Sequence, residues 1–164
     1  STIFCDGDGN AYLEGKAKDS DSSYFVLNGS SITSTDAVNS WCIVKNNDII
    51  YTASGSSVTD SKNGKVSGLD TIYCITYSVT DNSVYVGTGK GLVRLPVDDD
   101  GKLTGTKNDP PGNFSSTIKN YQVLSVLATK DAIYCGIAEI TSTYPHVKGL
   151  WSYYFEKRPN WNRE

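Results

Sequence analysis

The 164-residue chain contains no methionine, a single histidine and only five prolines. Because even an initiator methionine is missing, we expect a processed form or a fragment of a longer protein, and the repeat pattern below favours a fragment. No apolar run approaches the roughly 20 residues that a membrane-spanning helix needs, so no transmembrane segment is expected. The formal net charge of −3 argues against a nucleic-acid partner, because a polyanion normally meets a basic protein face.

Helical periodicity is also missing from the sequence. The best helical candidate, residues 121–130, is short and β-branched, so we expect a strand there. The chain holds eleven tyrosines and 15 glycines among many Val, Ile, Ser and Thr residues. Such a composition favours strands joined by tight turns, and it predicts an all-β fold.

One short pattern recurs along the chain. Residues 48–52, 82–86 and 131–135 each contain a polar residue, any residue, a β-branched aliphatic residue, a tyrosine, and a small or medium residue. Residues 1–5 fit as a fourth copy, with Phe4 in place of the tyrosine. The aromatic positions 4, 51, 85 and 134 lie 34 to 49 residues apart. This spacing falls in the range of β-propeller blades.

Each copy is predicted to be the second strand of a four-stranded antiparallel unit. An apolar segment precedes it, and a third strand follows, opened by Lys-Gly-Leu at residues 90–92 and 148–150. A turn at residues 98–101 is expected to lead into an outer strand at residues 102–104. The first unit is expected to lack its first strand, and the last to lack a clear fourth strand, because Pro159 is a poor interior strand residue. The units are predicted at residues 1–35, 36–69, 70–108 and 119–164.

The run from Val84 to Leu95 (VYVGTGKGLVRL) resembles the blades of bacterial β-propeller repeats of the two-component-regulator and lactonase-like kind. The second unit departs from this pattern, because residues 54–58 contain no Gly-Leu pair. The resemblance implies a β-propeller of four-stranded antiparallel blades, with about four blades present. It also implies a bacterial extracytoplasmic location, periplasmic or at the surface. Incomplete units at both ends would leave unpaired edges, so preceding sequence is expected to supply further blades or the closing strand. Otherwise, a four-bladed ring closes through a shared terminal strand, or further blades come from a second chain.

The glycine-rich residues 87–91 (GTGKG) invite comparison with a phosphate-binding loop. Such a loop needs a helix after its glycines, because the helix N-terminus supplies the amides and the dipole. The following residues, 92–96 (LVRLP), alternate like a strand and end at a proline. We therefore predict a hairpin turn at this place.

Two acidic stretches invite comparison with cation sites. Residues 6–10 (DGDGN) match the first half of a calcium loop, but Ala11 and Ala17 stand where such a loop needs glycine and an acidic residue. Residues 98–100 are three adjacent aspartates, which cannot all face one ion. Both stretches are interpreted as turns, and no metal or other cofactor is expected.

The four cysteines, at positions 5, 42, 74 and 135, contain no CxxC unit, so a zinc site is not expected. Cys42 and Cys74 are predicted at equivalent places on the first strands of their units, and Cys5 and Cys135 directly after the aromatic of the second strands. Free, buried thiols are expected, although an even count leaves disulfides open.

Candidate contact residues are expected in the long connections. In a four-stranded blade, the loop between the second and third strands and the loop to the next blade emerge on one face. The long connections at residues 106–120 and 139–148 should therefore open on the same face, where function usually resides. The predicted binding residues are Asp109, Asn113, Phe114, Tyr144 and His146. The alternative is that these loops are tolerated insertions.

Three functions remain open from the sequence. The first is a non-catalytic module that senses or binds a protein, a small molecule or a carbohydrate, because no catalytic constellation is recognisable. The second is a propeller enzyme of the lactonase or glycan-processing kind that acts from the loop face, with His146 or an acidic residue as its base. The third is a structural domain of a larger protein. Many unrelated functions use this fold, so the resemblance does not choose among them.

Overall fold

A computed structural model of the chain describes residues 49–111, 118–139 and 148–155 in full. For residues 3–5, 11–14, 24–28, 31–35, 40–44, 147 and 161–163 it describes the strand backbone alone. The described residues form strands, turns and bends and contain no helix. Accordingly, none of them belongs to a helix that could cross a membrane.

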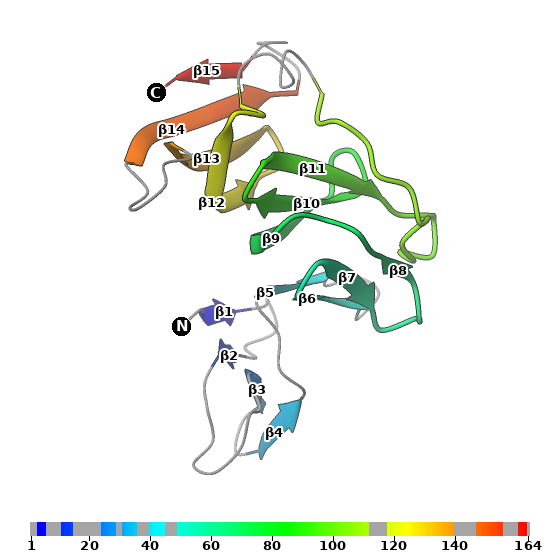
Figure 1. Cartoon of the computed structure of the whole chain (residues 1–164). Helices are drawn as coiled ribbons and strands as arrows, with labels where there is room; N and C mark the ends of the chain where they lie inside the picture. The colour runs from blue at the N-terminus through cyan, green and yellow to red at the C-terminus, as the bar shows by residue number, and fades with distance from the viewer. Residues whose placement is uncertain are drawn as a thin grey trace.

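The strands form four antiparallel sheets that follow one another along the chain (Figure 1). The first sheet contains β1 (Ile3–Cys5), β2 (Ala11–Glu14), β3 (Tyr24–Asn28) and β4 (Ser31–Thr35). The second contains β5 (Ser40–Val44), β6 (Ile49–Ser54), β7 (Ser57–Asp60) and β8 (Lys65–Val66). The third contains β9 (Ile72–Ser78), β10 (Ser83–Thr88) and β11 (Gly91–Pro96). The fourth contains β12 (Tyr121–Ala128), β13 (Ala132–Glu139), β14 (Val147–Tyr154) and β15 (Trp161–Arg163).

In every sheet each strand pairs with the next one in the chain, so the sheets are simple meanders. The second, third and fourth sheets are in face-to-face contact through β5, β6, β9, β10 and β12. The prediction of an all-β chain of antiparallel sheets is confirmed. The sheets do not close into a ring. They fall within the four predicted unit ranges, and their membership of one propeller domain stays a prediction.

The tyrosines of the shared pattern lie where the pattern predicts. Tyr51 lies on β6, Tyr85 on β10 and Tyr134 on β13, each the second strand of its sheet. The fourth copy, however, was assigned to the wrong aromatic. Phe4 lies on β1, the first strand, and pairs in register with Tyr12 on the second strand. Phe4 and Tyr12 both lie in short apolar segments, so only the strand pairing shows which of them is on the second strand.

Two predictions about incomplete units are wrong. The first sheet has four strands, because residues 24–28 and 31–35 supply the two outer ones. The last sheet also has a fourth strand, β15, which pairs with β14. This strand begins at Trp161, after Pro159, so the proline interrupts no ladder in it.

The predicted outer strand at residues 102–104 is not a regular strand. Leu103 and Asn108 form isolated bridges, to Val97 and Arg94 respectively. Gly101 and Gly105 flank the first bridge and have φ angles of 79° and 83°, in the left-handed region. The backbone at both glycines departs from the extended strand conformation, so this segment forms isolated bridges at the edge of the third sheet and no regular strand.

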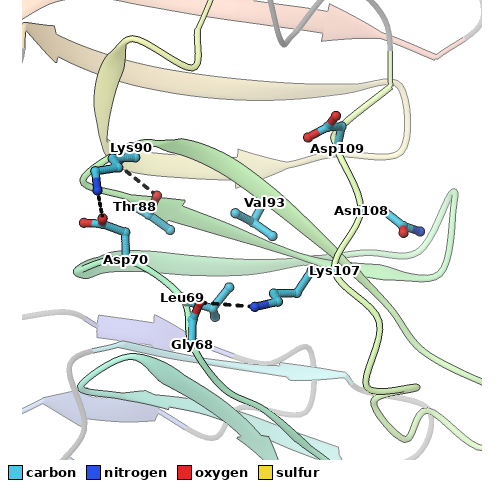
Figure 2. A pocket seen from close by; sticks show the side chains of 9 residues that line it. All are labelled: Gly68, Leu69, Asp70, Thr88, Lys90, Val93, Lys107, Asn108 and Asp109. Carbon is cyan, nitrogen blue, oxygen red and sulfur yellow. Dashed lines mark hydrogen bonds and ion pairs between the residues drawn. The ribbon is translucent and has the colours of Figure 1, made fainter.

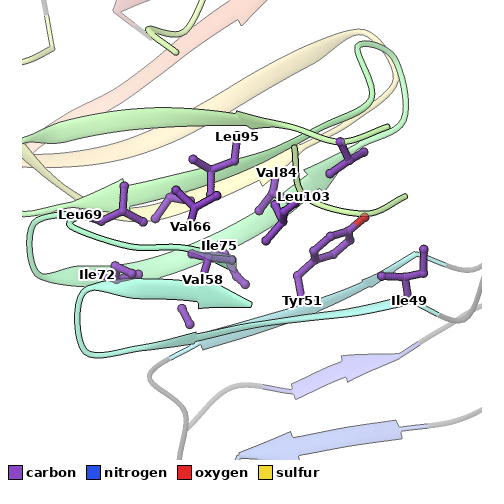
Figure 3. Close-up of a cluster of buried hydrophobic side chains, with 13 residues drawn as sticks. Ile49, Tyr51, Val58, Val66, Leu69, Ile72, Ile75, Val84, Leu95 and Leu103 are labelled. Carbon is purple, nitrogen blue, oxygen red and sulfur yellow. The ribbon is translucent and has the colours of Figure 1, made fainter. Parts of the chain in front are cut away.

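A hydrophobic core fills the space between the second and third sheets (Figure 3). Tyr51 is fully buried there, its ring stacks on that of Tyr77 at 5.8 Å, and its hydroxyl donates to the carbonyl of Gly101. Each aliphatic side chain buried in this way contributes about 1.5–3 kcal/mol. The buried members are Ile49, Tyr51, Ala53, Val58, Val66, Leu69, Ile72, Ile75, Val84, Val86, Leu95, Val97 and Leu103.

A second core joins the opposite face of the third sheet to the fourth sheet. Tyr85 is fully buried in it, and its hydroxyl donates to Asp81 at 2.7 Å. Arg94 holds the same carboxylate at 2.9 Å. The buried members are Tyr85, Leu92, Ile118, Val123, Ile133, Cys135, Ile137 and Tyr153. The third sheet is therefore covered on both faces.

A buried carboxylate ties the second sheet to the segment that follows the third. Asp60 Oδ1 accepts the backbone N–H groups of Lys62 and Gly64, and Oδ2 accepts that of Leu103 at 2.7 Å. Gly64 lies so close that a Cβ atom there would stand 2.0 Å from Asp60 Oδ2. One side chain thus satisfies three backbone donors that the fold removes from water.

Replacing Asp60 by alanine leaves these buried donors unpaired, and we expect the free energy of unfolding to fall by about 3 kcal/mol or more. Asp98 is a matched control, because its exposed carboxylate also accepts two backbone N–H groups. Water can replace that carboxylate, so Asp98→Ala should cost less than about 1 kcal/mol. Chemical denaturation measures both losses, and equal values would contradict the role given to Asp60.

Candidate functional site

A pocket of about 540 Å³ opens where three connections meet. They are the β8–β9 connection, the β10–β11 turn, and the segment that follows the third sheet (Figure 2). Its lining residues are Gly68, Leu69, Asp70, Thr88, Lys90, Val93, Lys107, Asn108 and Asp109. Leu69 and Val93 give it an apolar part, and the other side chains are polar or charged.

The β10–β11 turn is the predicted hairpin. The two strands pair in register from Ser83↔Pro96 to Thr88↔Gly91. The Thr88 hydroxyl donates to the carbonyl of Gly91 at 2.8 Å and accepts the N–H of Lys90 at 3.2 Å. Gly91 has a φ of 100°, which only glycine adopts readily. The backbone N–H of Lys90 is thus already bonded within the turn. A strand follows the turn, whereas a phosphate-binding loop needs a helix at that place.

An ion pair stands at the mouth of the pocket. Lys90 Nζ lies 3.1 Å from Asp70 Oδ2, and the N–H of Thr71 donates to Asp70 Oδ1 at 2.8 Å. The Lys90 hydrogen bond, followed by that from Thr71, lowers the pKa of Asp70 below its usual value of 3.8. The Lys90 side chain is 77% exposed. A pair so open to water contributes at most about 1 kcal/mol to stability, so both groups are accessible to a ligand.

Gly89 sets the distance between the turn and Asp70. A Cβ atom at Gly89 would stand 2.7 Å from Asp70 Oδ1. The Gly89 N–H donates to the carbonyl of Thr71 at 2.8 Å. The turn therefore docks on the β8–β9 connection through its backbone, and that approach requires glycine.

The segment that follows the third sheet, which forms one side of the pocket, is held in place by two sets of hydrogen bonds. The Lys107 ammonium donates to the carbonyls of Ser67 and Gly68 at 3.2 and 3.1 Å. Asn108 and Arg94 exchange both backbone hydrogen bonds, at 2.9 and 3.0 Å. These contacts bring the exposed Asp109 to the pocket.

Of the predicted binding residues, the structure places Asp109 in this pocket. Asn113, Phe114, Tyr144 and His146 lie outside the described residues. Asp109 lines the pocket together with Lys90 of the β10–β11 turn, and its role in binding stays a prediction.

Sequence reasoning missed the other charged groups of the pocket. The glycine-rich sequence around Lys90 predicts a hairpin turn, and nothing in it indicates that the lysine pairs with a distant carboxylate. Asp70 and Lys107 carried no local signal, because they reach the site through contacts with segments 20 and about 40 residues away. The glycine at position 89 is the one local sign that something approaches this turn closely.

The acidic stretches give no metal centre in the described part of the chain, where no three His, Cys, Asp or Glu residues cluster suitably. Residues 98–101 form the expected turn: Asp98 Oδ1 accepts the N–H groups of Asp100 and Lys102, and the Gly101 N–H donates to the carbonyl of Asp98. Residues 6–10 lie outside the described residues.

The placement of the cysteines differs from the prediction. Cys42 pairs with Tyr51, whereas Thr76 is the residue opposite Tyr85 and Cys74 lies opposite Gly87. The two cysteines are thus not equivalent, because the apolar pattern of a strand does not fix its register. Cys5 lies on a first strand and Cys135 on a second. Cys74 and Cys135 are free thiols, as expected. The side chains of Cys5 and Cys42 are outside the described part.

Burial should make both described thiols unreactive in the folded protein. Burial raises the pKa of Cys74 to about 12 and that of Cys135 well above its usual value, so both stay protonated at neutral pH, and the thiolate is the reactive form. We expect alkylation at pH 8 to be at least about 100-fold slower in native than in denatured protein. Peptide mass spectrometry reads each cysteine separately, and rapid native labelling of either would refute this assignment.

Comparison with known proteins yields little. No family model matches the chain, and no curated protein matches it. Among solved structures, it is similar to the extracellular domain of a protein described as a hybrid two-component system from B. thetaiotaomicron, at 15% identity and a TM-score of 0.39. The match covers 99% of this chain and 32% of that one, so the chain spans about a third of its length.

Proposed function

We propose that the chain is a non-catalytic binding module and that the pocket around Asp70 and Lys90 holds its ligand. The observation that carries the proposal is the exposed ion pair between Lys90 and Asp70. It lies at a turn that requires glycine at position 89, in the same pocket as the apolar side chains of Leu69 and Val93. Backbone hydrogen bonds hold the β10–β11 turn against the β8–β9 connection and Asn108 against β11. A few placed polar groups around an apolar part are typical of small-molecule sites.

The chemistry of the lining favours a ligand with many hydroxyl groups. Two carboxylates accept hydrogen bonds, the ammonium of Lys90 donates them, and Leu69 and Val93 offer a surface for C–H groups. Carboxylate, ammonium and amide groups together satisfy both the donor and the acceptor side of a hydroxyl. We therefore propose a carbohydrate as the ligand class.

The Asp70 carboxylate is poorly suited to act as a general base. A general base works best when its pKa lies near the operating pH. The Lys90 and Thr71 hydrogen bonds move the pKa of Asp70 in the opposite direction, below 3.8. This favours binding over the lactonase or glycan-processing alternative.

The scaffold that we propose for this module is a β-propeller. Its support is the sequence of meander sheets that pack face to face, with the shared tyrosine on each second strand of the last three. An extracytoplasmic location, as the sequence resemblance implies, belongs to the same proposal.

A calorimetric and NMR titration with neutral and acidic oligosaccharides tests the function. For a sugar that binds, Asp70→Asn and Lys90→Gln should each weaken binding by about tenfold, the usual effect of losing a hydrogen bond to a charged group. Lys102→Gln is the matched control: this lysine is exposed at the residue 98–101 turn, outside the pocket, and its change should leave affinity within about twofold.

Affinity should also stay constant between pH 8 and pH 5, because a lowered pKa keeps Asp70 ionised throughout this range. Failure of every sugar to bind at millimolar concentration would contradict the ligand class. Unchanged affinity in both pocket variants would contradict the site, and conversion of the sugar during the titration would show an enzyme.

A further inference from the structure

Two opposite charges enter the pocket from the segment that follows the third sheet. Lys107 and Asp109 both line the pocket, and Figure 2 shows their side chains turned toward it, whereas the intervening Asn108 is turned away. Side chains alternate in this way along an extended segment, and the backbone pairing of Asn108 with Arg94 holds the segment extended here. We call the part of the pocket beside Lys107 and Asp109 its charged end.

The Lys107 ammonium is fixed in position, but its charge is not neutralised. Its two hydrogen bonds go to the carbonyl oxygens of Ser67 and Gly68, at 3.2 and 3.1 Å. Both acceptors are uncharged, and no carboxylate of the described residues forms an ion pair with this ammonium. An ammonium carries three N–H donors, so one of them is left for a ligand. The charged end therefore offers a positioned cation to an anionic group.

The Asp109 carboxylate is the acceptor of the charged end. Its residue is exposed, and within the described parts of the chain nothing donates a hydrogen bond to it or pairs with its charge. Asp70, the other carboxylate of the pocket, is already held by Lys90 and by the N–H of Thr71. A cationic group of a ligand therefore finds its unpaired partner at Asp109.

The spacing of these two groups fits one small zwitterion. Side chains at alternate positions of an extended segment start about 6–7 Å apart. An ammonium and a carboxylate bonded to the same carbon atom can reach one group each, because a charged hydrogen bond spans about 2.8 Å on either side. A ligand with a carboxylate alone would bring it close to Asp109 as well as to Lys107, so it matches the charged end less well.

We propose that the ligand is a sugar joined to a free α-amino acid, whose ammonium binds Asp109 and whose carboxylate binds Lys107. This inference rests on the function proposed above, because the sugar occupies the other part of the pocket, beside Asp70 and Lys90. In Figure 2 that ion pair and Asp109 lie on either side of Val93, and the pocket volume of about 540 Å³ suits a single small molecule. Such a compound is what remains of a glycoprotein when the peptide bonds on both sides of a glycosylated residue are hydrolysed.

The test uses the full chain and serine O-glycosides of glucose, galactose, mannose and N-acetylgalactosamine. Calorimetry compares each glycosyl serine with the methyl glycoside of the same sugar, and with the same glycosyl serine capped as its N-acetyl methyl amide. For a sugar that binds, the uncapped glycosyl serine should bind about tenfold more tightly than either control compound. It alone gains two charged hydrogen bonds, and each contributes modestly because the site is open to water.

Substitutions separate contact with the ligand from support of the fold. Asp109→Asn and Lys107→Gln should each reduce the tenfold preference to about threefold or less, and should leave the affinity for the methyl glycoside within about twofold. A purely structural effect would weaken the binding of all three compounds alike. Asp99→Asn is the matched control, because Asp99 is an exposed aspartate of the residue 98–101 turn, outside the pocket, and this variant should keep the full preference.

Equal affinity for the uncapped and capped compounds would overturn this inference and leave the function proposed above standing, since the sugar would still bind. A preference that persists in both pocket variants would also overturn it, because the amino acid would then bind elsewhere. Serine alone binding as tightly as the glycosyl serine would show that the sugar contributes nothing. Binding of no sugar and no glycosyl serine at millimolar concentration would overturn both proposals.

Discussion

The structure depends on one constraint: a sheet with apolar residues on both faces must have a neighbour on each side. The third sheet shows this most clearly, because successive residues of β10 alternate between two cores. Val84 and Val86 enter the core shared with the second sheet, whereas Tyr85 enters the core shared with the fourth. Every residue of β10 is buried as a result. The shared tyrosine thus joins one sheet to the next.

The candidate site follows from this stacking. Neighbouring sheets pack against each other through their central strands. The loops at the ends of the sheets make contact only where those loops lie close together. At one such end, the Gly89 amide reaches the Thr71 carbonyl, and Asp70 is drawn against Lys90. The pocket is therefore formed where the β8–β9 connection meets the third sheet and the segment that follows it, and its charged groups are Asp70, Lys90, Lys107 and Asp109.

The sequence predicts whatever depends on local pattern. The second-strand tyrosines, the hairpin at residues 87–91 and the turn at residues 98–101 were correctly expected, since glycine, aspartate and β-branched residues act within a few positions. Pairing between distant segments was not foreseeable. Phe4 lies on a first strand, and Cys74 is not equivalent to Cys42, because a single strand does not encode its register. The role of Asp70 is not predictable from the sequence for the same reason: its partner is 20 residues away.

The buried carboxylate of Asp60 has a consequence for how the chain acquires its structure. Its third donor, Leu103, is 43 residues further along, beyond the whole third sheet. The Tyr51 hydroxyl and the Lys62 ammonium likewise reach carbonyls of residues 100 and 101. The polar contacts of the second sheet are thus incomplete until the third sheet and the segment that follows it have been synthesised and have folded against the second sheet. We therefore expect these two units to unfold as one cooperative block, because polar contacts as well as apolar packing join them. A chain cut between these two units would leave unsatisfied polar groups in both halves. The boundaries between independently stable parts of the protein therefore differ from the unit boundaries that the spacing of its tyrosines predicts.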